Sequence, residues 1–236
     1  MSQATYKSRV EKALASIIEK IEKAAVRSGR NLRDITIVAV TKSHPVTAII
    51  EAIDCEVFDL GENRVAELKM KQSEVTDDRV RWHMIGHLQG RKVAGVLGAT
   101  HLIHSVDSLK LAKKLSSKAV ESGKKEQVLL QINASRESTK GGFIFPEMEA
   151  DLYSALALPG LRIRGLMTMA PFTDDTKMLR NTFRTVRELQ QDLNKSHRCT
   201  GEELSMGMSN DFEIAIEEGS TMVRLGTALF GRPIKQ

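Results

Sequence analysis

The sequence has little cysteine, few aromatic residues and no long hydrophobic run. Its two cysteines, Cys55 and Cys199, are far apart and have no paired spacing, which excludes a disulfide framework and a thiolate metal site. Residues 1–30 lack the apolar stretch of a secretory signal, and no segment approaches the roughly 20 apolar residues of a membrane span. We therefore expect a protein of the reducing cytoplasm that does not insert in a membrane.

Basic charge and aromatic residues are too sparse and too dispersed for a nucleic-acid interface. The chain of 236 residues has 35 Lys+Arg against 30 Asp+Glu, a net charge of +5, and only 4% aromatic residues. Nucleic-acid binding needs clustered basic side chains with aromatic side chains that stack on bases. We expect no nucleic-acid partner.

Short apolar runs alternate with segments of helical periodicity along most of the chain. The first run, residues 35–40, is too apolar for a half-exposed strand and is typical of a strand buried on both faces of a parallel sheet. The runs are at 35–40, 57–60, 82–85, 102–105, 128–132, 163–167, 204–206 and 222–225, and helical segments are expected at 47–53, 65–73, 91–97, 108–122, 147–158, 174–195 and 212–218. This alternation predicts a parallel sheet with crossover helices.

Eight such units predict an α/β fold of the (β/α)8 TIM-type barrel, with an extra helix over residues 8–27 that ends at Gly29. An open doubly wound sheet is the alternative. No linker interrupts residues 1–236, so we expect a single domain with the N-terminal helix, within residues 1–30, packed on the barrel. In barrels of this type the chemistry lies at the carboxyl ends of the strands.

Lys42 stands at the expected end of the first strand, after seven uncharged residues. The rim of an apolar barrel mouth would partly desolvate its amine, and a desolvated amine is a nucleophile that condenses with aldehydes. A solvated lysine at a strand end is the alternative, and strand context alone leaves both open.

Two glycine-and-hydroxyl pairs follow the last two strands. Gly207 precedes Ser209 after the seventh run, and Gly226 precedes Thr227 after the eighth. Glycine allows the backbone to approach a ligand, and the loops after strands seven and eight are where barrels most often bind phosphate. The alternative for the first pair is an ordinary helix cap, in which Asn210 and Glu213 form a capping box.

Arg224 lies within the eighth run, between Val223 and Leu225. Strand alternation places its side chain on the face opposite these two apolar neighbours. A guanidinium buried there needs an anion or another acceptor, because an unpaired buried charge is costly. A salt bridge to a strand carboxylate is the structural alternative.

Six motifs in order resemble the pyridoxal phosphate homeostasis protein family, also called the proline synthase co-transcribed protein family. They span residues 35–231, nearly the whole chain. The motifs are TK (41–42), FDLGEN (58–63), WHMIGHLQ (82–89), GLMTM (165–169), LSMGMS (204–209) and GSTMVRLGTALFG (219–231). Two departures, Gly90-Arg91-Lys92 after the Leu-Gln pair and the tail Arg232-Pro233-Ile234, affect peripheral contacts only.

The resemblance implies a barrel like the N-terminal domain of alanine racemase, with pyridoxal 5′-phosphate held as a Schiff base on Lys42. It implies that Arg224 faces the pyridine nitrogen. The other residues that the motifs assign to the cofactor are Ser209, Gly226 and Thr227 at the phosphate and Asn63 and Met206 at the ring.

An arginine at the pyridine nitrogen leaves that site unsuited to a second proton, so the ring should stay neutral and act as a weaker electron sink. This disfavours transaminases and decarboxylases. Racemisation needs an acid/base group on each face of the substrate Cα. Alanine racemase takes its second base, a tyrosine, from an extra domain, whereas Tyr6 and Tyr153 lie on predicted outer helices. We therefore expect no catalytic residues beyond the cofactor site.

Two histidine patterns favour structural roles. His83 and His87 have the spacing of a metal pair on a helix, but their run is predicted to be a strand end, with no carboxylate or third histidine evidently beside them. His44 is close to Lys42 in sequence, and the adjacent Pro45 indicates a turn before a helix. We predict no metal site.

The leading hypothesis is a non-enzymatic, or at most weakly catalytic, carrier or buffer of pyridoxal phosphate in vitamin B6 homeostasis, acting as a monomer or weak dimer. Enzymes that use pyridoxal phosphate are candidate partners, and the sequence leaves open whether the cofactor is transferred to them. A low-activity amino-acid racemase is the second hypothesis. The third is a phosphate-binding barrel enzyme for sugar or nucleotide substrates that uses Lys42.

Overall fold

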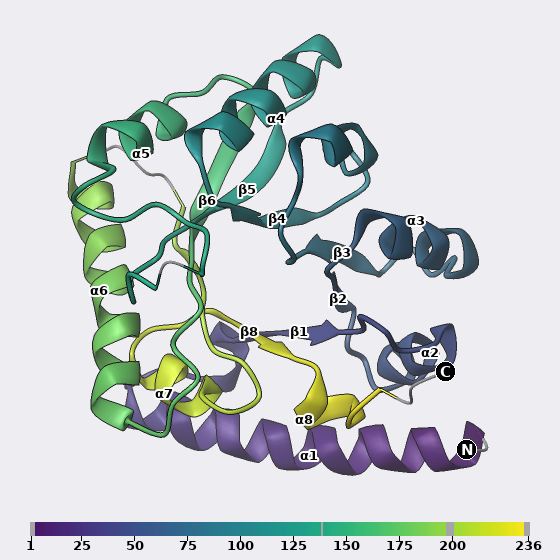
Figure 1. Ribbon diagram of the computed structural model, residues 1–236. Coiled ribbons are helices and arrows are strands. Elements are labelled where there is room, and N and C mark those ends of the chain that lie inside the picture. Colours follow the sequence, from purple (N-terminus) through teal and green to yellow (C-terminus); the bar gives the residue numbers. More distant parts are fainter. Residues whose placement is uncertain (1–2, 138, 197–200, 234–236) are drawn as a thin grey trace.

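The computed structural model describes residues 3–137, 139–196 and 201–233, which form a closed barrel of parallel strands in sequence order, β1 to β8 (Figure 1). The predicted barrel is confirmed, and the open-sheet alternative is wrong. The strands are β1 (Thr36–Val40), β2 (Asp59–Glu62), β3 (Arg81–Met84), β4 (Leu102–Val106), β5 (Glu126–Gln131), β6 (Leu161–Met167), β7 (Glu203–Ser205) and β8 (Met222–Leu225).

Helices surround the strands, as crossover connections between parallel strands require. They are α2 (Val46–Asp54), α3 (Val65–Glu74), α4 (Leu109–Glu121), α5 (Glu149–Leu156), α6 (Thr176–Lys195), α7 (Phe212–Glu217) and α8 (Thr227–Phe230). The predicted N-terminal helix is confirmed as α1 (Gln3–Arg27), which packs against α7, α8 and α2 and runs beneath them in Figure 1.

The helices differ from the prediction at two places, residues 91–97 and α8. Residues 91–97 were expected to form an α-helix, but a 3₁₀ segment, η2 (Gly90–Gly95), takes their place. Glycines at both of its ends weaken an α-helix there, and Gly98 follows with a φ of 65°. The short helix α8 has four residues, too few to show a helical period.

Side chains fill both the inside and the outside of the barrel. On β8, Val223 and Leu225 join the main core between strands and helices, whereas Met222 belongs to a separate small cluster with Leu102 and Leu129. The strand alternation predicted for Arg224 is thereby confirmed, since it shares the inner face with Met222. The barrel interior is therefore a packed core and not a channel.

No helix among the described residues is both long and apolar enough to cross a membrane. Cys55 lies just beyond α2, partly buried. The prediction that Cys55 and Cys199 form no disulfide involves Cys199, which lies outside the described ranges.

Candidate functional site

Four neighbouring strands, β7, β8, β1 and β2, bring the ends that carry the predicted residues to one sector of the barrel rim. Val40 on β1 is in register with Gly61 on β2. A side chain at Gly226 would begin 3.3 Å from the carbonyl oxygen of Val40. Lys42 and Asn63, each two residues beyond the β1–β2 register pair, therefore stand beside the turn that begins at Gly226.

Lys42 lies in the turn after β1, and its side chain is exposed. The turn closes with a hydrogen bond from the His44 N–H to the Thr41 carbonyl oxygen, 2.9 Å, and Ser43 has a φ of 60°. The expectation that an apolar rim desolvates this amine is wrong, because β1 ends at Val40 and the chain leaves the barrel wall there. The amine is accessible to a ligand from solvent.

A buried ammonium holds the residue just before Lys42. The Lys71 Nζ, on α3, donates to the Thr41 carbonyl oxygen, to Glu62 Oε1 and to Glu67 Oε1, each at 2.7 Å. The side chains of Lys71 and Glu62 are 1% and 0% exposed. Burial raises the pKa of Glu62 against the opposing effect of the Lys71 and Thr41 hydrogen bonds.

Glu62 Oε2 has no hydrogen-bond partner among the described residues. The other carboxylate of the cluster, Glu67, accepts the Ser43 N–H at 2.6 Å as well as Lys71. The turn that carries Lys42 is therefore fixed at the residues on both sides of it by one charged cluster. Sequence reasoning missed this cluster because Lys71 resembles an ordinary helix-surface lysine.

The two turns expected to bind phosphate are joined directly. The Ser209 Oγ accepts a hydrogen bond from the Ala228 N–H at 3.1 Å, which ties the turn after β7 to the start of α8. Gly207 has a φ of 90°, and a Cβ there would lie 2.9 Å from the Phe212 Cα. Glycine is required at Gly207 by both its conformation and its close packing. The structure thus brings together Ser209, Gly226 and Thr227.

The capping box expected between Asn210 and Glu213 is wrong. α7 begins one residue later, with Asp211 at the N-cap position, and the Met208 N–H donates to Asp211 Oδ1 at 2.6 Å. The Asp211 carboxylate therefore accepts from a residue before the helix and not, as a helix cap would, from the first residues of α7. Burial raises the pKa of this carboxyl.

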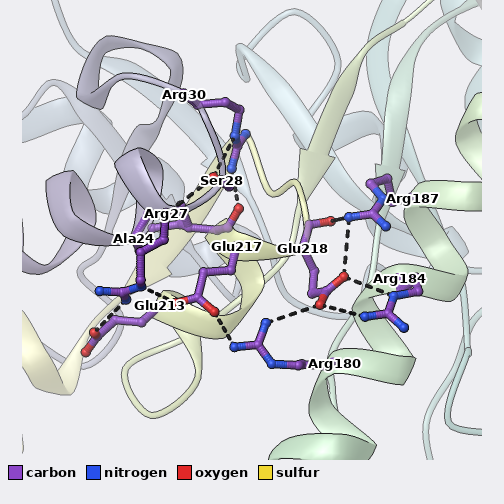
Figure 2. Close-up of polar contacts among 11 residues, drawn as sticks. Ala24, Arg27, Ser28, Arg30, Arg180, Arg184, Arg187, Glu213, Glu217 and Glu218 are labelled. Carbon is purple, nitrogen blue, oxygen red and sulfur yellow. Dashed lines mark hydrogen bonds and ion pairs between the residues drawn. The ribbon is translucent and has the colours of Figure 1, made fainter.

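α7, which follows this turn, is held at its far end by a cluster of ion pairs (Figure 2). Glu217 contacts Arg27 of α1 at 2.6 Å, and Glu218, just beyond α7, is 5% exposed. Glu218 accepts at 3.1–3.3 Å from three arginines of α6, namely Arg180, Arg184 and Arg187. These contacts place α7 between α1 and α6 and so fix the element on which the Gly207 turn rests.

Arg224 is buried on the inner face of β8. Its Nη1 donates to the Ser205 carbonyl oxygen at 2.7 Å and to the Ser205 Oγ at 2.6 Å, and its Nη2 donates to the Thr168 carbonyl oxygen at 2.9 Å. Burial lowers the pKa of Arg224 to about 10, so it stays charged at neutral pH. The alternative of a direct salt bridge is wrong: among the described residues its acceptors are these neutral oxygens.

Met206 and Asn63 have different surroundings. Met206 follows β7 and is fully buried in the main core, where Phe212 and Ala215 also lie. Asn63 is half-buried in the bend after β2, and a side chain at Gly86 would begin 2.4 Å from its carbonyl oxygen. The structure therefore places Asn63 at the rim with Lys42, while the Met206 side chain packs outside the barrel wall.

The two histidines four residues apart have separate partners. His87 is exposed, and its Nδ1 lies 2.8 Å from Asp107 Oδ2. His83 is buried on β3 beside a carboxylate and a second histidine: its Nε2 lies 2.9 Å from Asp59 Oδ1 and its Nδ1 2.8 Å from His104 Nε2. The expectation that such partners are missing beside His83 is wrong.

The neighbours of His83 come from the two adjoining strands, β2 and β4, 24 and 21 residues away in the sequence, so no local motif could reveal them. Within the described ranges, these groups and all other His, Cys, Asp and Glu side chains form no arrangement that could hold a metal ion. His44 is buried after the turn, 5.1 Å from the Phe230 ring, and burial lowers its pKa. It packs against α8 and forms part of the wall behind the Lys42 turn.

The alanine racemase N-terminal domain family matches residues 13–233 of this chain. The pyridoxal phosphate homeostasis protein of Aquifex aeolicus is 39% identical over 219 residues, covering 92% of this chain and 96% of the relative. The protein of the same name from Escherichia coli K12 is 38% identical over 224 residues, covering 92% of this chain and 94% of the relative.

Solved structures extend the likeness to three dimensions. PipY of Synechococcus elongatus PCC7942, solved with PLP bound, has a TM-score of 0.81 and 34% identity, and the match covers 94% of this chain and 100% of PipY. Alanine racemase of Clostridium difficile 630, in complex with cycloserine, has a TM-score of 0.78 at 17% identity and covers 95% of this chain and 60% of the enzyme, which shows a shared fold. The chain belongs to the pyridoxal phosphate homeostasis protein family and has the alanine racemase N-terminal fold.

Proposed function

We propose that this protein is a non-enzymatic carrier that holds pyridoxal 5′-phosphate as a Schiff base on Lys42 and so limits the free concentration of a reactive aldehyde. The proposal rests on how three parts of the site lie relative to one another. An exposed primary amine after β1 stands beside the linked turns of Ser209 and Gly226, above the buried guanidinium of Arg224 on the adjoining strand. The bound PLP in the related PipY supports the same ligand.

The residues at the rim match the three chemical parts of the ligand. An aldehyde needs an accessible amine, which Lys42 supplies. A phosphate needs N–H and hydroxyl donors and close backbone approach, which the turns of Ser209, Gly226 and Thr227 supply. A pyridine nitrogen needs a hydrogen-bond donor, which Arg224 supplies.

Two of the predicted ring contacts enter the proposal differently. Asn63 stands at the rim next to Lys42, so we assign it a contact with the ring edge. Met206 is fully buried in the main core. We assign it a supporting role in which it fixes the end of β7, and therefore the position of the Gly207 turn.

When bound, the ligand supplies an electrophilic aldehyde and a ring that can withdraw electrons from an attached amine. Arg224 can donate a hydrogen bond to an unprotonated ring nitrogen but cannot accept one from a protonated ring nitrogen, so it favours a neutral ring and weak electron withdrawal. Of the chain's two tyrosines, Tyr153 lies on the outer helix α5, where its hydroxyl donates to Glu149 Oε1 at 2.5 Å. This leaves the second acid/base position that racemisation requires without a tyrosine from α5.

A low-activity racemase is the second candidate function, because the fold is shared with alanine racemase. This function predicts that the loaded protein interconverts L- and D-alanine, which chiral chromatography would measure. The carrier proposal expects conversion at the rate of pyridoxal phosphate and free lysine alone.

The carrier proposal includes transfer to client enzymes, because the Lys42 side chain is exposed: an incoming amine could reach the ligand carbon bonded to Lys42, form the new bond there and release the Lys42 amine. We expect the loaded protein to reactivate a pyridoxal-phosphate-dependent enzyme stripped of its cofactor. Reactivation should also occur when a membrane permeable only to small molecules separates the two proteins, if release into solution precedes capture. Faster reactivation on direct mixing identifies direct transfer.

The experiment that tests cofactor attachment is the visible absorption spectrum of the purified protein after addition of pyridoxal phosphate and gel filtration. We expect the protein to retain a yellow chromophore, and Lys42→Ala to lose it. Lys113→Ala, at an exposed lysine of α4, is the matched control and should stay yellow. Equal retention of colour by the Lys42→Ala protein would remove Lys42 from its assigned role.

A further inference from the structure

A chain of hydrogen bonds crosses the interior of the barrel from Arg224 on β8 to Asp59, the first residue of β2. Ser205 Oγ, which accepts from Arg224, lies 2.8 Å from His104 Nδ1. His104 Nε2 lies 2.8 Å from His83 Nδ1, and His83 Nε2 lies 2.9 Å from Asp59 Oδ1. All five side chains are buried, with His83 and His104 both 0% exposed.

The two ends of this chain determine the direction of every hydrogen bond in it. Arg224 can only donate, so Ser205 Oγ accepts from it and has its own hydrogen available for His104 Nδ1. His104 must then carry its proton on Nε2 and donate to His83 Nδ1. His83 in turn carries its proton on Nε2 and donates to Asp59, an acceptor when ionised.

The opposite direction leaves groups unsatisfied at both ends. A proton on His104 Nδ1 would give Ser205 Oγ two donors and no acceptor for its own hydrogen in the chain. A neutral His83 would then face the Asp59 carboxylate with a lone pair. Unsatisfied buried polar groups of this kind are costly.

Asp59 is an anion well suited to end the chain. Burial opposes its ionisation, but hydrogen bonds from Arg81 and His83 prevail and lower its pKa to about 2. The Arg81 side chain, 50% exposed, connects this end of the chain to solvent at the amino ends of the strands. Burial, the largest effect, places the pKa of His104 well below its ordinary value, which agrees with a neutral ring.

The aligned hydrogen bonds also help the buried Arg224 to keep its charge, although its direct acceptors are neutral oxygens. Each O–H or N–H in the chain directs its negative end toward Arg224 and its positive end toward Asp59. The dipoles therefore stabilise the guanidinium and the carboxylate together. The charge of Asp211 also favours the charged form of Arg224, and Asp59 adds a second, more distant counter-charge through His83, His104 and Ser205.

We propose that Ser205, His104, His83 and Asp59 are positioning residues that hold Arg224 as a charged donor toward the ring nitrogen of the bound ligand. The proposal rests on the proposed function for its ligand, but the hydrogen-bond direction belongs to the protein alone. None of the four residues needs to contact the ligand. Removing one link should loosen or reorient Arg224 and weaken binding of a ligand whose ring nitrogen accepts from it.

Histidine ¹⁵N NMR of the ligand-free protein at neutral pH tests the direction of the chain. We expect both His83 and His104 to show a protonated Nε2 and a non-protonated Nδ1. A His104 protonated on Nδ1, or doubly protonated, would overturn the proposal. This measurement needs neither ligand nor variant.

Ser205→Ala tests the effect on the ligand, because it removes one hydroxyl, adds no bulk and leaves the two main-chain acceptors of Arg224 in place. We expect roughly fivefold to tenfold weaker binding of pyridoxal phosphate and a change in the His104 tautomer. Ser220→Ala is the matched control: Ser220 is equally buried, but among the residues described its Oγ donates only to the carbonyl oxygens of Leu204, Met206 and Met222. It should leave the His104 signals and the affinity unchanged.

Asp59→Asn is a second variant, which retains an acceptor for His83 but removes the negative charge. We expect weaker binding of pyridoxal phosphate, even though Asp59 lies at the amino end of β2 and the ligand-binding residues lie beyond the carboxyl ends of the strands. Wild-type affinity in both Ser205→Ala and Asp59→Asn would overturn the positioning role. If the wild-type protein bound no pyridoxal phosphate, the proposed function would fail, whereas the NMR result would still decide the direction of the chain.

Discussion

Lys71 Nζ donates a hydrogen bond to the carbonyl oxygen of Thr41 at 2.7 Å, so a fully buried ammonium on α3 holds the residue that precedes the exposed Lys42. The same ammonium forms ion pairs with both Glu62 and Glu67. The position of the reactive amine therefore depends on a charged cluster under the turn.

Lys71→Met should lower the free energy of unfolding by about 3 kcal/mol, because it leaves the Glu62 carboxylate buried without its cation. Urea denaturation measures the change. The double variant Lys71→Met with Glu62→Gln removes both charges and should recover at least half of the loss. A double variant no more stable than the single one would show that the cost does not come from the unpaired charge.

Glu218→Ala should destabilise the protein by about 2 kcal/mol, because it leaves Arg180, Arg184 and Arg187 close together without the carboxylate they share. The matched control is Glu213→Ala, whose side chain is 39% exposed and lies 3.7 Å from Arg27. An exposed pair of this kind contributes less than about 1 kcal/mol. Thermal and urea denaturation of the two variants should therefore differ, and equal losses would contradict the assigned role of Glu218.

The stability of the protein should depend on pH through Asp59, whose pKa is about 2 in the folded protein against an ordinary value of 3.8. A lowered pKa stabilises the folded state above the unfolded-state value, by about 2 kcal/mol here, and this contribution is lost as the pH falls through about 2. Asp59→Asn should therefore be less stable than wild type at pH 7. The difference should shrink below about pH 4, and a difference independent of pH between 7 and 3 would contradict this origin.

Ser209→Ala should weaken binding of pyridoxal phosphate about fivefold, because the Ala228 N–H loses its acceptor and the two turns lose their link. Pyridoxal, which lacks the phosphate, should bind both proteins equally. Ser117→Ala, at an exposed serine of α4, controls for removal of a hydroxyl. Equal losses for the two ligands would place Ser209 away from the phosphate.

The eight strands and the rim residues could be predicted from the sequence because their signals are local. A β-branched run such as 35–40 marks a buried strand by composition, and the residue after it marks the rim. The exposure of Lys42 could not be predicted in this way, since it depends on where the turn leaves the barrel wall. The one-residue shift of the α7 start to Asp211 depends on a side-chain contact that no period encodes.

The polar residues inside the barrel could not be connected from the sequence. His104 and Ser205 are 101 residues apart and meet only because the sheet closes. Each looks like an isolated polar residue in an apolar strand. Their relation to Arg224 appears only when the alternation of three strands is placed on one closed surface.

The most direct test of the central claim is borohydride reduction of the protein with pyridoxal phosphate, followed by digestion and mass analysis of the modified peptide. Reduction makes the bond between the ligand aldehyde and a lysine permanent, so the modified residue can be located. The account predicts one stoichiometric modification at Lys42, retained in Lys113→Ala and absent in Lys42→Ala. Modification spread over several surface lysines, or a single site at another lysine, would contradict it.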